Sequence, residues 1–203
     1  SQGVGTSLKH FAGNEQETRR FLINSIISDR ALHEIYLRPF EMAVKHANPW
    51  TLMGAYNAVN GVPACQNNYL LNEVLRDQWG YTGAVMSDWV ATRDKLEAHN
   101  NGLDIEMPGP ARKNEYLVEQ VKAGNISIET IDTHALNVLN LIQKADEGKK
   151  EVTEINWHAH NDLSQQVAEE SIVLLKNDSD LLPLSKNKNY ALIGQFAKNS
   201  RFQ

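Results

Sequence analysis

Two patterns of hydrophobic and polar positions follow one another along the first two thirds of the chain. Short apolar runs without alternation are typical of strands buried on both faces, and apolar residues three and four positions apart are typical of helices. These patterns predict strands at 5–11, 50–56, 83–86 and 103–107. They predict helices at 28–47, 67–79, 92–100, 114–123 and 127–145. Because strand and helix alternate in units of roughly 30 residues, we expect an α/β fold with a parallel sheet.

Local signals refine two of these helices. Pro39 lies inside the first helix and is expected to kink it, because proline lacks the backbone N–H that the helix needs. Ser127 precedes the last helix and is expected to cap its N-terminus. The expected core face of that last helix consists of Ile131, Val138 and Ile142.

The length of the repeating region limits the architecture. A closed (β/α) barrel of eight units needs about 250 residues, so residues 1–145 are expected to form the C-terminal half of a TIM-type barrel. Composition then changes, and the charged stretch at 146–161 reads as a linker. Residues 162–203 are expected to begin a second domain, with a helix at 162–177 and a strand at 190–193. Neither end completes a unit, so we expect the chain to begin and end within domains.

Composition excludes several classes of protein. The chain has 203 residues, a net charge of −5 and no block rich in Lys or Arg, so a nucleic-acid or anionic-membrane partner is not expected. Apolar runs do not reach transmembrane length, and no basic and apolar leader opens the chain. Cys65 is the only cysteine, which excludes an internal disulfide and leaves the compartment open.

Polar side chains stand at the ends of three predicted strands. Asp88 follows the third apolar run, and Trp89 places a flat apolar face beside it. Lys9 and His10 end the first strand, and Tyr56 ends the second. In a parallel barrel these ends share one face, where active sites lie. Lys9 and His10 can bind sugar hydroxyls, the Lys9 charge favours ionised Asp88, and Tyr56 can donate a hydrogen bond to that carboxylate.

Each residue taken alone also has a structural interpretation. A strand-end aspartate such as Asp88 is slightly more often a helix cap or a lysine partner than a catalytic group. A lone His10 is more often structural, and a lone Tyr56 is more often a core residue. Trp89 alone is as readily explained by packing as by a substrate platform. A metal site is not expected, because no second carboxylate adjoins Asp88. Only their grouping at successive strand ends favours a catalytic site.

Other polar residues are assigned structural roles. Glu17, Arg19 and Arg20 are expected to form a structural ion pair or a solvated turn. Asp104 and Glu106 are expected to serve structure rather than chemistry. The Trp-His-Ala-His run at 157–160 has the composition of a metal site, but it falls in the predicted linker, where a solvated role is favoured.

Five segments then match the motifs of one known family. They are KHFAGNEQE at 9–17, GAYNAVNGVP at 54–63, VMSDW at 85–89, GLDIEMPG at 102–109 and AEESIVLLKN at 168–177, with Leu-Pro-Leu at 182–184. In this order they resemble glycoside hydrolase family 3, and most of all its β-glucosidase branch. The resemblance covers essentially the whole chain. It departs at Val90, where the family commonly has glycine, and the distinctive loop of the N-acetylglucosaminidase branch is absent.

The resemblance implies a retaining exo-glycosidase that releases terminal β-D-glucosyl residues from β-glucosides or oligosaccharides, without a metal or cofactor. It implies that Asp88 is the nucleophile and that Lys9 and His10 bind hydroxyls of the terminal sugar. The tyrosine matching Tyr56 contacts the nucleophile, and the tryptophan matching Trp89 lines the sugar site. Retaining cleavage requires a second carboxyl group about 5–5.5 Å from the first.

In this family the acid/base glutamate usually comes from the α/β-sandwich domain, of which only the first helix and strand are expected here. Further sugar contacts of the family come from before residue 1. The chain is therefore expected to need N-terminal and C-terminal segments of a parent enzyme for activity. The alternative is a catalytically incompetent fragment that binds carbohydrate or serves structure.

Overall fold

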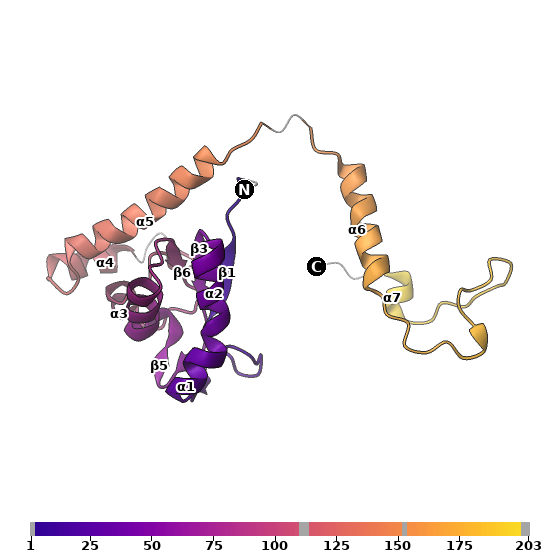
Figure 1. Cartoon of the computed structure of the whole chain (residues 1–203), viewed down its shortest axis with the longest axis horizontal. Helices are drawn as coiled ribbons and strands as arrows, with labels where there is room; N and C mark the ends of the chain where they lie inside the picture. Colours follow the sequence, from indigo (N-terminus) through magenta and orange to yellow (C-terminus); the bar gives the residue numbers. More distant parts are fainter. Residues whose placement is uncertain (1–2, 110–113, 152–153, 200–203) are drawn as a thin grey trace. The chain divides into compact units, whose positions relative to one another are not determined.

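The chain divides into two compact units, Ser1–Glu151 and Val152–Gln203. A computed structural model describes residues 3–109, 114–151 and 154–199 (Figure 1). Among these residues, none of the helices is both long and apolar enough to cross a membrane.

A parallel sheet forms the centre of the first unit. It contains β1 (Ser7–Phe11), β3 (Thr51–Gly54) and β6 (Ala84–Met86), in the order β1-β3-β6. Both neighbouring pairs are parallel, which confirms the predicted α/β class. Because parallel strands end at one edge of a sheet, the residues that follow these three strands meet there.

The predicted strand at 103–107 is wrong in extent. Only one parallel bridge forms, between Met86 and Ile105. Asp104 explains why, because its Oδ2 atom accepts the backbone N–H of Val85 at 2.7 Å. A side chain thus takes the N–H that a longer neighbouring strand would use.

A second sheet with shorter strands forms from the segments that follow β1 and β3. It contains β2 (Asn24–Ser25), β4 (Ala58–Val59) and β5 (Val62–Pro63). Strands β4 and β5 are antiparallel, and the turn at 60–61 joins them with both residues at positive φ. This backbone conformation suits the Asn-Gly pair found there.

The first predicted helix forms as three consecutive segments: α1 (Asp29–Ala31), η1 (Leu32–Tyr36) and α2 (Arg38–Ala47). The N–H of Leu37 bonds to the carbonyl of Leu32 at 2.8 Å, five residues back, and Pro39 lies in the first turn of α2. Pro39 therefore lies at the start of a separate helical segment and not inside one continuous helix as was expected.

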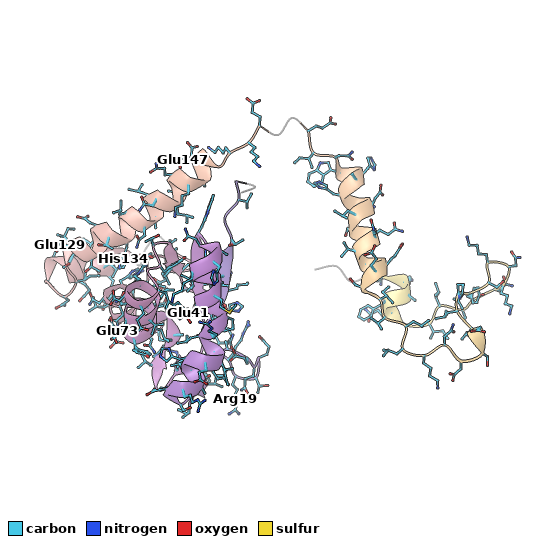
Figure 2. All side chains as sticks on the ribbon, viewed as in Figure 1. Arg19, Glu41, Glu73, Glu129, His134 and Glu147 are labelled. Atoms are coloured by element: carbon cyan, nitrogen blue, oxygen red, sulfur yellow. The ribbon has the colours of Figure 1, made fainter. Side chains whose placement is uncertain are left out.

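The remaining helices of this unit follow the predicted order, except that the short helix η2 was not predicted. They are η2 (Ala64–Gln66), η3 (Tyr69–Gln78), α3 (Lys95–Asn100), α4 (Asn114–Lys122) and α5 (Ile128–Glu147). Ser127 caps α5 as predicted, since its Oγ accepts the N–H of Thr130 at 3.0 Å. The predicted core face is wrong at Ile142, which is 58% exposed. The buried residue of α5 is instead His134, which Figure 2 shows on the helix between the ends marked by Glu129 and Glu147.

One hydrophobic core holds the sheet against the helices that follow β1 and β3. Its fully buried members include Phe11, Leu37, Leu52, Leu70, Leu71, Leu75 and Val85. Each such side chain contributes roughly 1.5–3 kcal/mol by leaving water. This packing holds the three strands in register and so fixes where their ends lie.

The second unit contains α6 (Trp157–Ser171), η5 (Asp178–Asp180) and α7 (Gln195–Lys198). Helix α6 begins at Trp157 rather than at 162, because Asn156 caps it by accepting the N–H of Ala159 at 3.0 Å. It ends at Ser171 rather than at 177, where β-branched residues favour extended backbone. The strand predicted at 190–193 does not form, since no described segment of this unit pairs with it.

Candidate active site

The predicted site residues lie at one edge of the parallel sheet. Lys9 and His10 belong to β1, Tyr56 follows β3 by two residues, and Asp88 follows β6 by two residues. The parallel order β1-β3-β6 therefore brings three distant parts of the sequence to one place.

Asp88 is the centre of this cluster. It is only 6% exposed, and its carboxylate has three donors around it. The backbone N–H of Trp89 donates to Oδ1 at 2.7 Å, and Nε2 of His10 lies 3.3 Å from Oδ2. The Tyr56 hydroxyl also lies close to this carboxylate. The structure thus brings His10, Tyr56 and Asp88 together.

The two side chains that face Asp88 are held neutral. Burial lowers the pKa of His10, and the nearby Asp88 carboxylate only partly opposes that effect. Burial also raises the pKa of Tyr56, and the nearby Asp88 carboxylate raises it further. At neutral pH, His10 and Tyr56 are therefore uncharged donors, and Asp88 has polar partners without a full counter-charge.

Lys9 lies differently from its neighbour. It is exposed while His10 is half-buried, as expected for adjacent residues of a strand. Among the residues that the structure describes, Lys9 forms no ion pair with Asp88, and its charge instead lowers the pKa of His10. The expected pairing of the Lys9 charge with Asp88 is therefore not seen. Trp89 is 56% exposed beside the buried carboxylate.

Two residues of the loop after β1, Arg20 and Phe21, lie against the ring of Tyr56. The guanidinium carbon of Arg20 lies 4.6 Å from the Tyr56 ring centre, and the ring of Phe21 lies 4.2 Å from it. Arg20 also forms the predicted ion pair with Glu17 at 3.0 Å. The sequence indicated an ion pair here but not that Arg20 and Phe21 stack on Tyr56, because the stacking depends on the path of the loop.

Cys65 is a buried thiol close to the ends of two strands, β3 and β6. This thiol donates to the carbonyl of Ala55 at 3.5 Å, and the backbone of Asp88 lies close to it. Burial raises the pKa of Cys65 to about 12, so the thiol stays neutral next to the Asp88 carboxylate. Cys65 thus lies between the segments that follow β3 and β6.

Asp104 and Glu106 have the structural roles expected for them. Asp104 is buried and lies 2.8 Å from Arg76 Nη2 and 2.8 Å from His134 Nδ1. Glu106 pairs with Lys95 at 2.6 Å.

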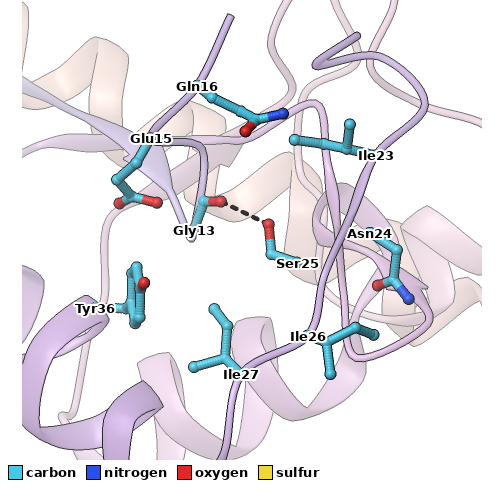
Figure 3. Close-up of a pocket in the computed structure, with 9 residues that line it drawn as sticks. All are labelled: Gly13, Glu15, Gln16, Ile23, Asn24, Ser25, Ile26, Ile27 and Tyr36. Carbon is cyan, nitrogen blue, oxygen red and sulfur yellow. Dashed lines mark hydrogen bonds between the residues drawn. The ribbon is translucent and has the colours of Figure 1, made fainter. Parts of the chain in front are cut away.

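A separate pocket of about 500 Å³ lies on the loop after β1 and the small sheet (Figure 3). Glu15 and Tyr36 face one another across it, and burial raises the pKa of Glu15. The Ser25 hydroxyl donates to the Gly13 carbonyl at 2.8 Å in its wall. None of the five predicted site residues lines this pocket.

A metal centre is not found in the described residues, where no three His, Cys, Asp or Glu side chains are placed to hold an ion. The Trp-His-Ala-His run at 157–160 forms the first turn of α6 and not a linker.

Comparison with known proteins identifies the family. The model of the glycosyl hydrolase family 3 N terminal domain matches residues 1–141. The chain is 46% identical over its whole length to thermostable beta-glucosidase B of Acetivibrio thermocellus and 44% identical to an exo-alpha-(1->6)-L-arabinopyranosidase of Bifidobacterium longum. It covers 27% and 28% of these proteins.

A solved structure gives the same result. The GH3 beta-glucosidase of Bifidobacterium adolescentis superposes with a TM-score of 0.82 at 46% identity. The match covers all of this chain and 30% of that one, so the chain spans less than a third of the length of these relatives. Since the family model covers well over half of its residues, the chain belongs to glycosyl hydrolase family 3.

Proposed function

We propose that this chain is part of a longer retaining, exo-acting glycoside hydrolase, called the full-length enzyme below. In it, residues 1–145 form the C-terminal half of a TIM-type barrel. The linker expected at 146–161 is shortened to the residues between α5, which ends at Glu147, and α6, which begins at Trp157 and starts an α/β-sandwich domain. The family match and the small share of the relatives' length that the chain covers support this proposal. The relatives' names, which include several beta-glucosidases, support β-D-glucosides as substrates.

The geometry around Asp88 is the observation that carries the proposal. A nucleophilic carboxylate must be oriented but must keep its negative charge, and Asp88 is buried against neutral donors rather than a cation. One Asp88 oxygen attacks the anomeric carbon and forms a glycosyl-aspartate as the bond to the leaving oxygen breaks. A second carboxyl group gives that oxygen a proton and then takes one from the water that releases the sugar.

The surrounding residues receive matching roles. Tyr56 orients Asp88 through its hydroxyl, and Lys9 and His10 hydrogen-bond hydroxyls of the terminal sugar. Trp89 offers an exposed aromatic face on which a sugar ring can lie. None of these roles requires a metal or a cofactor.

The acid/base group is assigned to segments outside this chain. Among the described residues, no second carboxylate contacts Asp88, whose partners are His10, Tyr56 and the N–H of Trp89. We therefore expect the isolated chain to be inactive towards aryl β-glucosides, and normal turnover by it would contradict this assignment. An isolated chain that binds glucose without turnover would have the binding role of the alternative hypothesis.

Mechanism-based labelling tests the role of Asp88. A 2-fluoro-glucoside should label the full-length enzyme on the peptide that carries Asp88, as read by mass spectrometry. Asp88→Asn should lower kcat by about 1,000-fold or more. Asp94→Asn is the matched control, because Asp94 only caps α3 by accepting the N–H of Glu97 at 2.9 Å. Label on any other residue would remove Asp88 as the nucleophile.

A second substrate class has its own support. Two relatives at 44% and 43% identity are named as exo-alpha-(1->6)-L-arabinopyranosidases. Comparing kcat/KM for nitrophenyl β-D-glucoside with kcat/KM for nitrophenyl α-L-arabinopyranoside distinguishes the two substrate classes. A higher value for the arabinoside would replace glucose as the preferred sugar and leave the Asp88 mechanism in place.

A further inference from the structure

We propose that Asp104 is a positioning residue for catalysis: its buried carboxylate fixes strand β6 and thereby sets where the Asp88 carboxylate lies. The inference rests on the proposed function, because it concerns the nucleophile assigned there. Asp104 itself does not touch Asp88, and it acts through the backbone between them.

The Asp104 carboxylate is fully used by four donors. Its side chain is 0% exposed. Oδ2 accepts the N–H of Val85 at 2.7 Å and Nη2 of Arg76 at 2.8 Å, while Oδ1 accepts Nδ1 of His134 at 2.8 Å and Nδ2 of Asn137 at 2.9 Å. Two ionised oxygens can satisfy four such donors, whereas an amide cannot, because its nitrogen is itself a donor.

These donors tie β6 to two helices. Arg76 belongs to η3, while His134 and Asn137 belong to α5, and Val85 is the middle residue of β6. The carboxylate therefore anchors the strand three residues before Asp88.

The segment after Asp104 continues the attachment past the nucleophile. The N–H of Ser87 donates to the carbonyl of Ile105 at 2.9 Å, and the N–H of Met107 donates to the Ser87 hydroxyl at 2.8 Å. The N–H of Val90 then donates to the carbonyl of Met107 at 2.7 Å. Asp88 is thus held on both sides by a segment that begins at Asp104.

This attachment matters for catalysis because the partners of Asp88 come from other strands. His10 belongs to β1 and Tyr56 follows β3, so their distances to Asp88 depend on the position of β6 in the sheet. A displacement of about 1 Å at a reacting group can cost about 100-fold in rate.

Asp104→Asn in the full-length enzyme tests the proposal. We expect kcat for nitrophenyl β-D-glucoside and the rate of labelling by a 2-fluoro-glucoside to fall by about 100-fold, while the Kd for glucose changes by less than about threefold. Glu106→Gln is the matched control, since Glu106 lies two residues along, pairs with Lys95 at 2.6 Å and does not bond to β6. Its labelling rate should stay within about threefold of the unmodified enzyme.

Labelling of Asp104→Asn at the unmodified rate would overturn the proposal. Equal losses of labelling and glucose binding would indicate lost folded protein, and the test then passes to a second variant. If Asp104→Asn does not fold, Ser87→Ala removes the hydroxyl that accepts the N–H of Met107 at 2.8 Å and donates to the Met107 carbonyl at 3.4 Å, and we expect labelling about tenfold slower at unchanged glucose affinity. Unchanged labelling of a folded Ser87→Ala would then overturn it. Failure of the unmodified enzyme to label on Asp88 would instead refute the proposed function.

Discussion

At the scale of single residues, Val90 occupies a backbone conformation that its side chain disfavours. Its φ is +59°, a region rarely occupied by β-branched residues, and its side chain is 67% exposed and packs little. Val90 follows Trp89 directly, so this unfavourable backbone conformation lies next to the candidate site.

We expect Val90→Gly to raise the free energy of unfolding by about 1 kcal/mol, because glycine removes the strain but adds chain entropy to the unfolded state. Urea unfolding followed by circular dichroism measures it. Val118→Gly is the control: this exposed valine lies within α4, and its replacement should lower the free energy of unfolding by about 0.5 kcal/mol. A loss at Val90 as large as at Val118 would show that its conformation carries no strain.

Cys65 gives a second prediction at this scale. The only thiol of the chain is buried, and burial raises its pKa to about 12. Since the thiolate is the reactive form, we expect the folded protein at pH 8 to react with dithiobis-nitrobenzoate far more slowly than the same protein in guanidinium. Equal rates in the two states would contradict the burial of Cys65.

The grouping of His10, Tyr56 and Asp88 was predictable from strand ends alone, because parallel strands present their ends at one edge. The stacking of Arg20 on Tyr56 was not, since it depends on how the loop after β1 returns over the sheet. That Lys9 does not pair with Asp88 was not predictable either. It depends on which residues of β1 face Asp88, and the sequence leaves this open.

At the scale of elements, a buried histidine of α3, His99, lies against His134 of α5, with 5.5 Å between the ring centres. Burial lowers the pKa of His99, and the neighbouring His134 and Lys95 lower it further. The carbonyl of Leu103, 2.8 Å from His99 Nδ1, and the carboxylate of Glu106 act in the opposite direction.

Because the folded-state pKa of His99 lies below its ordinary value of 6.5, the unfolded chain binds a proton below pH 6.5 that the folded chain does not. Stability should therefore decrease as pH falls below 6.5, by at most about 1.4 kcal/mol per pH unit from this residue. His99→Asn, whose amide can still donate to Leu103, should reduce this slope in urea titrations at pH 5–7. Since burial also lowers the pKa of His10, part of the slope should remain. An unchanged slope would contradict the assignment to His99.

The order of helices and strands in the first unit followed from periodicity, because apolar spacing reports which face is buried. The short extent of the 103–107 segment did not, since it depends on the Asp104 side chain taking the N–H of Val85. The strand expected at 190–193 also failed, because a strand needs a paired neighbour that its own sequence cannot supply.

At the scale of the whole molecule, the two units differ in burial. The first has a core that contains Leu52, Leu70 and Val85, whereas α6 has no buried residue. Hydrogen exchange reports how often a backbone hydrogen bond opens, and buried packing keeps it closed.

We therefore expect peptides from 50–54 and 70–76 of the chain to exchange much more slowly than peptides from 157–171. Exchange measured by mass spectrometry from seconds to hours tests this expectation. Protection of α6 equal to that of the core peptides would show that α6 is packed against another part of the chain.

The two outer sides of the sheet differ in a way that concerns association. Strand β6 is covered along its outer side by the segment that begins at Asp104, whereas β1, at the other end of the order, pairs only with β3 among the described strands. An uncovered strand offers its N–H and C=O groups to any other extended chain. In the isolated chain, β1 is thus the side of the sheet at which a strand of another molecule adds most readily, so aggregation should begin there.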